Sequence, residues 1–177
     1  MAKRVSKRPN WLMAAHIVDI YSVSPCACED FADYKYSEYH ERNGFWLFDS
    51  PERIRSIAKE QSIQLDGTVL FYYEVYELEF DHEKWQAFGS EPSFPTNVRV
   101  PTNKHLEGFD VATFNPYGRG IEHSPLSCNS MADKLATNSH CLFASLEEAQ
   151  ENLNNKSFSD CEPGPYRIFS VNSVGWS

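Results

Sequence analysis

A ten-residue pattern that contains a cysteine occurs twice in the chain and is the first candidate for chemistry. Residues 24–33 read SPCACEDFAD and residues 124–133 read SPLSCNSMAD, so both share Ser-Pro-x-x-Cys-x-x-x-Ala-Asp. Serine followed by proline is typical of a helix start, because serine can cap the free amides and proline fits the first helical position. Cys28 and Cys128 would then lie at the end of the first turn, where the helix dipole favours a thiolate.

A cysteine nucleophile also needs a base, and two histidines flank the second copy of the pattern. His123 directly precedes its Ser-Pro pair, and His140 follows further along the chain. Asn129 is placed to orient the base or to stabilise an oxyanion. One interpretation is therefore a group-transfer or hydrolytic enzyme that uses Cys128 with His123 or His140 as its catalytic residues.

The alternative is that the cysteines are part of the scaffold, and the spacing favours it. Cys128, Ala132 and Leu135 recur at intervals that place them on one face of a helix. Free cysteine is among the most buried residue types and often serves as a small apolar side chain. On this interpretation the repeated pattern is duplicated structure, and function lies elsewhere.

Metal binding is a third option for the same region. Two sets of soft or borderline ligands are present, namely Cys26, Cys28 and His40, and Cys128, His140 and Cys141. Neither set has the paired C-x-x-C spacing of a structural zinc site. We therefore expect no metal and no other cofactor.

Charged residues inside apolar segments suggest a ligand site instead. Glu74 lies beside Tyr73 in the segment 69–78, which reads VLFYYEVYEL, and Arg167 occupies the matching place in the segment 166–171. Such a carboxylate and guanidinium can pair, or can contact a ligand. A glycine-containing loop adds a further cation, so the predicted ligand-binding residues are Tyr73, Glu74, Arg119 and Arg167. The competing interpretation is that Glu74, Glu77 and Glu79 simply reach solvent from one strand.

The elements that would position these residues follow one order twice. Segments rich in β-branched and aromatic residues at 17–23 and 109–114 precede the two Ser-Pro patterns. After each pattern comes a second apolar segment and then a helix. Ser50 with Pro51 predicts the first of these helix starts, and Ser145 with Glu148 forms a capping box at the second. A further strand completes each unit, so the sequence predicts two tandem β-α-β-α-β pseudo-repeats.

These units predict a fold and its boundaries. Residues 1–10 form a basic, flexible arm, residues 11–88 and 109–177 form two α/β halves, and residues 89–108 form a proline-containing linker. The predicted fold class is α+β, with both halves packed as one compact domain around a mixed sheet that helices cover. The crevice between the halves is the expected ligand site, because loops from both copies would meet there.

Composition limits the possible partners. The formal net charge is −9 and four cations fall within the first eight residues, so the rest of the chain would repel phosphate backbones. No segment is long and apolar enough to span a membrane. Five cysteines in a chain of 177 residues fit reduced thiols better than a disulfide framework. We expect a cytoplasmic protein with no nucleic-acid or membrane partner, and its oligomeric state stays open.

Taken together, these observations favour a binding or interaction protein. It would recognise a small molecule or a protein partner in the cleft between its two halves. The cysteine-dependent enzyme is the alternative.

Overall fold

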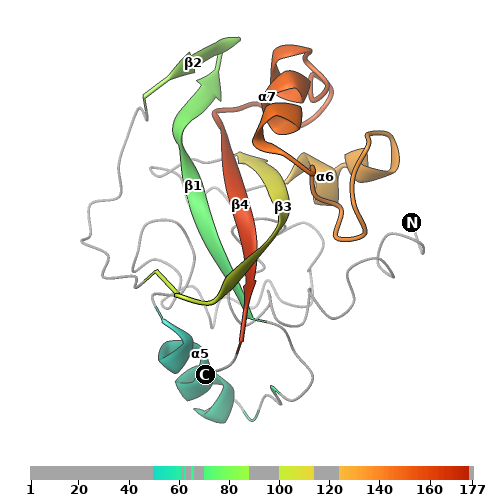
Figure 1. Cartoon of the computed structure of the whole chain (residues 1–177). Helices are drawn as coiled ribbons and strands as arrows, with labels where there is room; N and C mark the ends of the chain where they lie inside the picture. Colours follow the sequence, from blue (N-terminus) through green and yellow to red (C-terminus); the bar gives the residue numbers. More distant parts are fainter. Residues whose placement is uncertain are drawn as a thin grey trace.

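The computed structural model describes residues 50–60, 62, 65, 70–87, 100–113 and 124–175. Four strands form one sheet in the order β2-β1-β4-β3, with every neighbouring pair antiparallel. Figure 1 shows this sheet with α6 and α7 beside one end and α5 at the other. The strands are β1 (Leu70–Asp81), β2 (Lys84–Gln86), β3 (Lys104–Thr113) and β4 (Tyr166–Val174).

The helices are short and three of them lie in the connection from β3 to β4. Because this connection returns the chain antiparallel to β3, it does not build the parallel crossover of a mixed sheet. The expected mixed sheet is therefore wrong for the described strands, whereas the α+β class is confirmed. The helices are α5 (Pro51–Glu60), α6 (Pro125–Cys128), the 3₁₀ turn η4 (Met131–Asp133) and α7 (Leu146–Asn154).

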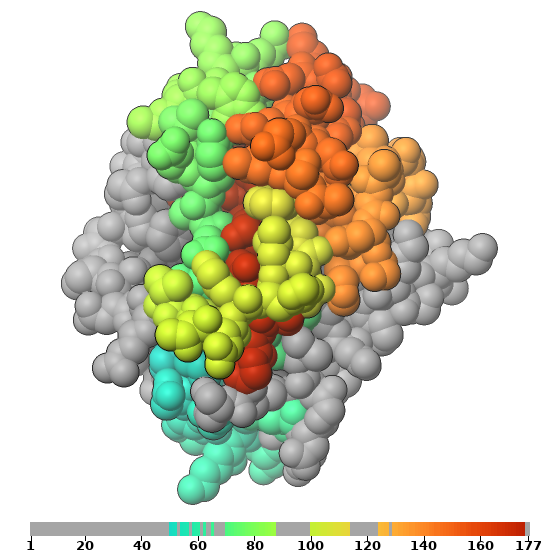
Figure 2. All heavy atoms as spheres, in the orientation of Figure 1, coloured from blue at the N-terminus to red at the C-terminus, as the bar shows by residue number. Residues whose placement is uncertain are grey.

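The central strand β4 is buried on both of its faces along most of its length. Tyr166 and Ile168 point to the face on which α6 and α7 pack, through Leu126, Ala149 and Leu153. Arg167, Phe169 and Val171 occupy the other face and are also buried. Figure 2 shows β4 as a narrow strip between β1 and β3 and again where its end emerges below β3.

Both predicted helix starts are confirmed. Pro51 is the first residue of α5, and Ile54 donates its amide to the Ser50 carbonyl at 3.4 Å. At α7 the Glu148 amide donates to Ser145 Oγ at 3.1 Å, and Glu148 Oε2 accepts from the Ala144 amide at 3.0 Å. The second helix therefore has the forward hydrogen bond of a capping box, whereas the return bond from Glu148 goes to the amide of Ala144, one residue before the cap.

The second copy of the cysteine pattern starts a helix as expected, but the helix is short. Ser124 stands at the N-cap and Pro125 opens α6, yet Ser124 Oγ donates to the buried Asp110 Oδ1 at 2.7 Å in place of capping an amide. The helix stops at Cys128, because Ser130 takes a left-handed conformation with φ of 58°. The continuous helix that would align Cys128, Ala132 and Leu135 is absent.

The segment before α7 differs from the expected strand. Cys141 has φ of 60°, which an extended strand cannot contain, and Asn138 Oδ1 accepts from the amides of His140 and Leu142. Only Phe143 pairs with β3, through a bridge to Phe109. This turn fits against the bulge at Gly108, where a Cβ would lie 2.6 Å from the Phe143 carbonyl oxygen.

Several predicted boundaries meet the described residues only in part. The arm 1–10, the segment 17–23 and the first cysteine pattern lie outside them, so the pseudo-repeat stays a prediction. Strand β3 begins at Lys104, within the range predicted as a linker. No helix in the described ranges is long and apolar enough to cross a membrane.

Candidate ligand pocket

A tight hairpin turn forms one side of the candidate site. Residues His82 and Glu83 join β1 to β2, with φ of 45° and 67°. Two consecutive left-handed residues are the pattern of a type I′ turn, whose twist matches the paired strands and which usually contains asparagine and glycine. This turn instead presents an imidazole and a carboxylate.

The end of α7 forms the opposite side of the site, and it too contains a residue in the left-handed conformation. Asn155 is the C-cap, and the Lys156 amide donates to the Leu153 carbonyl at 3.0 Å. Lys156 has φ of 57°, at the position after the C-cap that glycine most often occupies. A charged side chain again stands where the backbone favours glycine.

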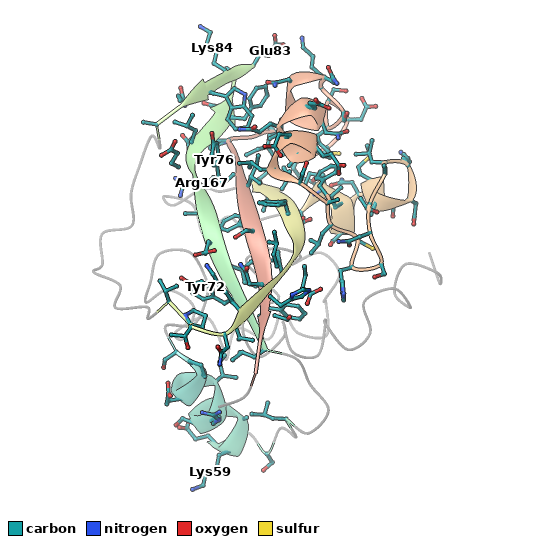
Figure 3. The ribbon with its side chains drawn as sticks, viewed as in Figure 1. Lys59, Tyr72, Tyr76, Glu83, Lys84 and Arg167 are labelled. Carbon is teal, nitrogen blue, oxygen red and sulfur yellow. The ribbon has the colours of Figure 1, made fainter. Side chains whose placement is uncertain are left out.

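Side-chain contacts join the hairpin to α7. Lys156 Nζ donates to Glu83 Oε1 at 2.6 Å, and Trp85 Nε1 donates to Asn154 Oδ1 at 2.9 Å. The Trp85 ring also packs on Phe80, with 5.1 Å between ring centroids. Figure 3 shows Glu83 at the tip of the hairpin, near the end of α7 and far from Lys59 on α5.

Between these two elements lies a pocket of about 240 Å³. Its apolar wall is aromatic, because Phe80 of β1 and Tyr166 of β4 are direct cross-strand partners. The Phe158 ring lies 6.0 Å from that of Tyr166. The complete lining is Phe80, His82, Glu83, Leu153, Lys156, Phe158, Ser159, Cys161, Pro163, Gly164 and Tyr166.

The ionisable groups in the wall are held in their neutral forms. Burial raises the pKa of Tyr166 to about 12, and Cys161 and Glu162 act in the same direction. The Tyr166 hydroxyl donates to the Glu162 carbonyl. Burial also raises the pKa of the Cys161 thiol, followed by the charges of Glu162 and Asp160. Neither group is therefore an activated nucleophile near neutral pH.

The rim carries the charges. The hydrogen bond from Lys156 holds the pKa of the Glu83 carboxyl below its usual value, and the charge of Lys156 adds to this effect. Both side chains are largely exposed, at 59% for Lys156 and 67% for Glu83. The pair is therefore an exposed rim contact of low energy, and either side chain can exchange its partner for a ligand.

The sequence-predicted ligand residues lie elsewhere and are divided between the two faces of the sheet. Tyr73 and Arg167 are buried on the face away from α7, while Glu74 points to the opposite face with Tyr72 and Phe80. Arg119 lies outside the described residues. None of Tyr73, Glu74 and Arg167 lines the pocket.

The predicted pairing of Glu74 with Arg167 is wrong, because each residue has a different partner. Arg167 Nη2 donates to the buried Glu79 at 3.2 Å, because these two residues are aligned on adjacent strands. Glu74 instead accepts from Lys104 Nζ at 2.6 Å and from Ser170 Oγ at 3.3 Å. A bulge between Val75 and Glu79 shifts the register, which the sequence did not reveal.

The predicted catalytic residues are only partly described. His123 and the thiol of Cys128 lie outside the described part of the structure. His140 Nε2 lies 3.4 Å from Glu107 Oε2, and Glu107 Oε1 accepts from Ser173 Oγ at 2.5 Å. In the described ranges no cluster of three His, Cys, Asp or Glu side chains is arranged to hold a metal ion.

Sequence reasoning missed the pocket residues for a definite reason. Phe80 is far in sequence from Phe158 and Tyr166, which are themselves eight residues apart. The pairing of β1 with β4 brings Phe80 to Tyr166, and the turn after α7 brings Phe158 there. The hairpin itself gave no clear signal, because His82 and Glu83 are not the Asn-Gly or Asp-Gly type of pair that marks a two-residue turn. Comparison of the chain with protein-family models, curated proteins and solved structures found no significant match.

Proposed function

We propose that this protein binds a small molecule in the pocket between the β1–β2 hairpin and the end of α7. The observation that carries the proposal is the aromatic-walled pocket itself, with a charged rim over an apolar interior. Binding sites commonly combine an apolar lining with a few polar groups that orient the ligand. The lining draws on both sequence ranges, 11–88 and 109–177, that were expected to meet at a ligand site.

The pocket's size limits the ligand. Pockets for drug-sized ligands occupy roughly 300–1,000 Å³. A volume of about 240 Å³ therefore suits one compact apolar group or a single ring with a polar substituent. A binding role also fits the neutral Tyr166 and Cys161, since neither is prepared for proton transfer or attack.

Two further expectations complete the proposal. The net charge of −9 supports a partner other than nucleic acid, and the odd number of five cysteines supports reduced thiols and so a place in the cytoplasm. The cysteine-dependent enzyme stays a prediction from the sequence, because Cys128 and His123 have no described side-chain geometry.

The pocket can be tested with neutral probes and a blocking variant. Phenol and 3,3-dimethyl-1-butanol are titrated into ¹⁵N-labelled protein, and the shifts of backbone amide signals are followed. We expect saturable shifts at Phe158, Ser159 and Gly164. Ser159→Trp, an exposed position on the rim, should abolish them by filling the pocket.

The matched control is Asp160→Trp, which introduces the same ring at an exposed neighbouring residue that does not line the pocket. This variant should bind both probes as the wild type does. Equal binding by Ser159→Trp and the wild type, or no saturable shifts at these amides, would contradict the proposal.

A further inference from the structure

The segments that form the pocket carry more negative than positive charge. Residues 80–84 and 153–166 contain four carboxylates, Asp81, Glu83, Asp160 and Glu162, against the two ammonium groups of Lys84 and Lys156. The whole chain adds to this with its net charge of −9. A field of this sign attracts a cationic ligand and repels an anionic one.

The wall of the pocket is suited to a cation of low hydration. Three aromatic residues are among those that line the pocket, and each keeps a small exposed area, 9% for Phe80, 4% for Phe158 and 8% for Tyr166. Aromatic ring faces are electron-rich, and such rings recognise quaternary ammonium groups through cation–π attraction. An apolar wall alone would take a neutral group equally well.

The rim supplies a counter-ion that a ligand can reach. Glu83 Oε1 is held 2.6 Å from Lys156 Nζ in this structure, and both residues line the pocket. Because Lys156 is largely exposed, its side chain can turn toward solvent when another cation approaches Glu83. Figure 2 shows the hairpin tip and the segment after α7 next to each other at one end of the molecule.

We propose that the ligand of this pocket carries an alkylated ammonium group, held among Phe80, Phe158 and Tyr166 with Glu83 as its counter-ion. This inference rests on the proposed binding function and adds the chemical class of the ligand. Choline and trimethyllysine both carry such a quaternary ammonium group. A free small molecule and a modified protein side chain are its two sources.

The decisive comparison is between choline and 3,3-dimethyl-1-butanol, which share a shape and differ in the central charge. Calorimetry or amide shifts give both dissociation constants. We expect choline to bind roughly tenfold more tightly, as cation–π attraction in a partly desolvated site implies. Equal or tighter binding of the neutral alcohol would overturn this inference and leave the proposed binding function in place. If neither choline nor the alcohol binds, both the inference and the proposed binding function are contradicted.

Three variants test the assigned roles. Phe158→Leu keeps an apolar wall but removes a ring face, so it should weaken choline and leave the alcohol nearly unchanged. Glu83→Gln should likewise weaken choline binding and leave alcohol binding nearly unchanged. Because Glu83 is exposed, we expect this variant to fold normally. Lys156→Gly should tighten choline several-fold, because it frees Glu83 and removes a like charge.

Glu147→Gln, an exposed change in the first turn of α7 away from the pocket, is the matched control and should alter neither constant. Unchanged choline affinity in both Glu83→Gln and Lys156→Gly would contradict the role of Glu83. A short peptide with trimethyllysine, compared with its unmodified form, separates the two sources. Tighter binding of the modified peptide than of choline assigns a protein source, and the reverse order assigns a free small molecule.

Discussion

At the scale of single residues, the rim of the pocket shows amino acids that the backbone alone would not select. Lys156 lies in a left-handed conformation, which raises the energy of a non-glycine residue by about 1 kcal/mol or more. Its exposed contact with Glu83 is of a kind that stabilises a fold very little. Strained positions of this kind concentrate at functional sites, and here they place charges around an apolar pocket.

Cys161 should be an unreactive thiol in the native protein. Burial and the neighbouring carboxylates raise its pKa, so less of it is thiolate at pH 8 than in the unfolded chain. Alkylation by iodoacetamide, followed by mass spectrometry, should be slower in the native protein than in urea. Glu162→Gln should speed the native reaction, because it removes one of those negative charges. A native rate equal to the unfolded rate would show that the pocket does not protect the thiol.

At the scale of elements, features set by neighbouring residues could be predicted from the sequence, whereas features set by distant residues could not. The starts of α5 and α7 were predictable because a capping serine, a proline or a glutamate lies within a few residues of each. The strands β1 and β4 were predictable from their β-branched and aromatic residues. Strand β2 was missed, because three residues give no periodic signal and their pairing depends on the turn at His82 and Glu83.

The position of the candidate site depended on the element-scale information that was missing. Tyr73 and Glu74 were expected at one site, but neighbours in a strand point to opposite faces of the sheet. Arg167 was assigned to Glu74, whereas the bulge in β1 gives it Glu79. No local pattern reports such a register shift, and none places Phe158 over Tyr166.

The hairpin turn should gain stability from the residues that its geometry favours. Replacing His82 and Glu83 together by asparagine and glycine removes left-handed strain from a type I′ turn. We expect the thermal midpoint to rise by about 2–4 °C, measured by circular dichroism. Lys84→Asn, at the first residue of β2, should give no such rise. A lower midpoint in the double variant would mean that the Glu83 contact with Lys156 outweighs the strain.

At the scale of the whole molecule, one ion pair lies buried inside the sheet. Arg167 is completely buried beside Glu79, so the sheet holds this ion pair away from solvent. Removing one partner of such a pair leaves an uncompensated charge in the interior. We therefore expect the loss of either partner to destabilise the sheet.

The protein should lose stability in alkali. The pKa of Tyr166 rises from 10.0 to about 12 on folding, and those of Tyr72 and Cys161 rise as well. Because the folded state holds these protons more tightly, their contribution is complete below the unfolded values and is lost as pH rises toward 12. Urea unfolding at pH 8 and pH 11 should show the fall. Tyr166→Phe keeps the ring and should fall less, and an equal fall in both proteins would contradict this assignment.

The order β2-β1-β4-β3 also has a consequence for synthesis of the chain. Both neighbours of β4 are made before it, and the pairing of Tyr72 with Asn172 joins residues that emerge from the ribosome far apart in time. Until β4 arrives, β1 and β3 have unsatisfied edges that can pair with other chains. The newly made protein therefore depends on a late insertion at the centre of its sheet, and this interval is when it is most exposed to aggregation and to chaperones.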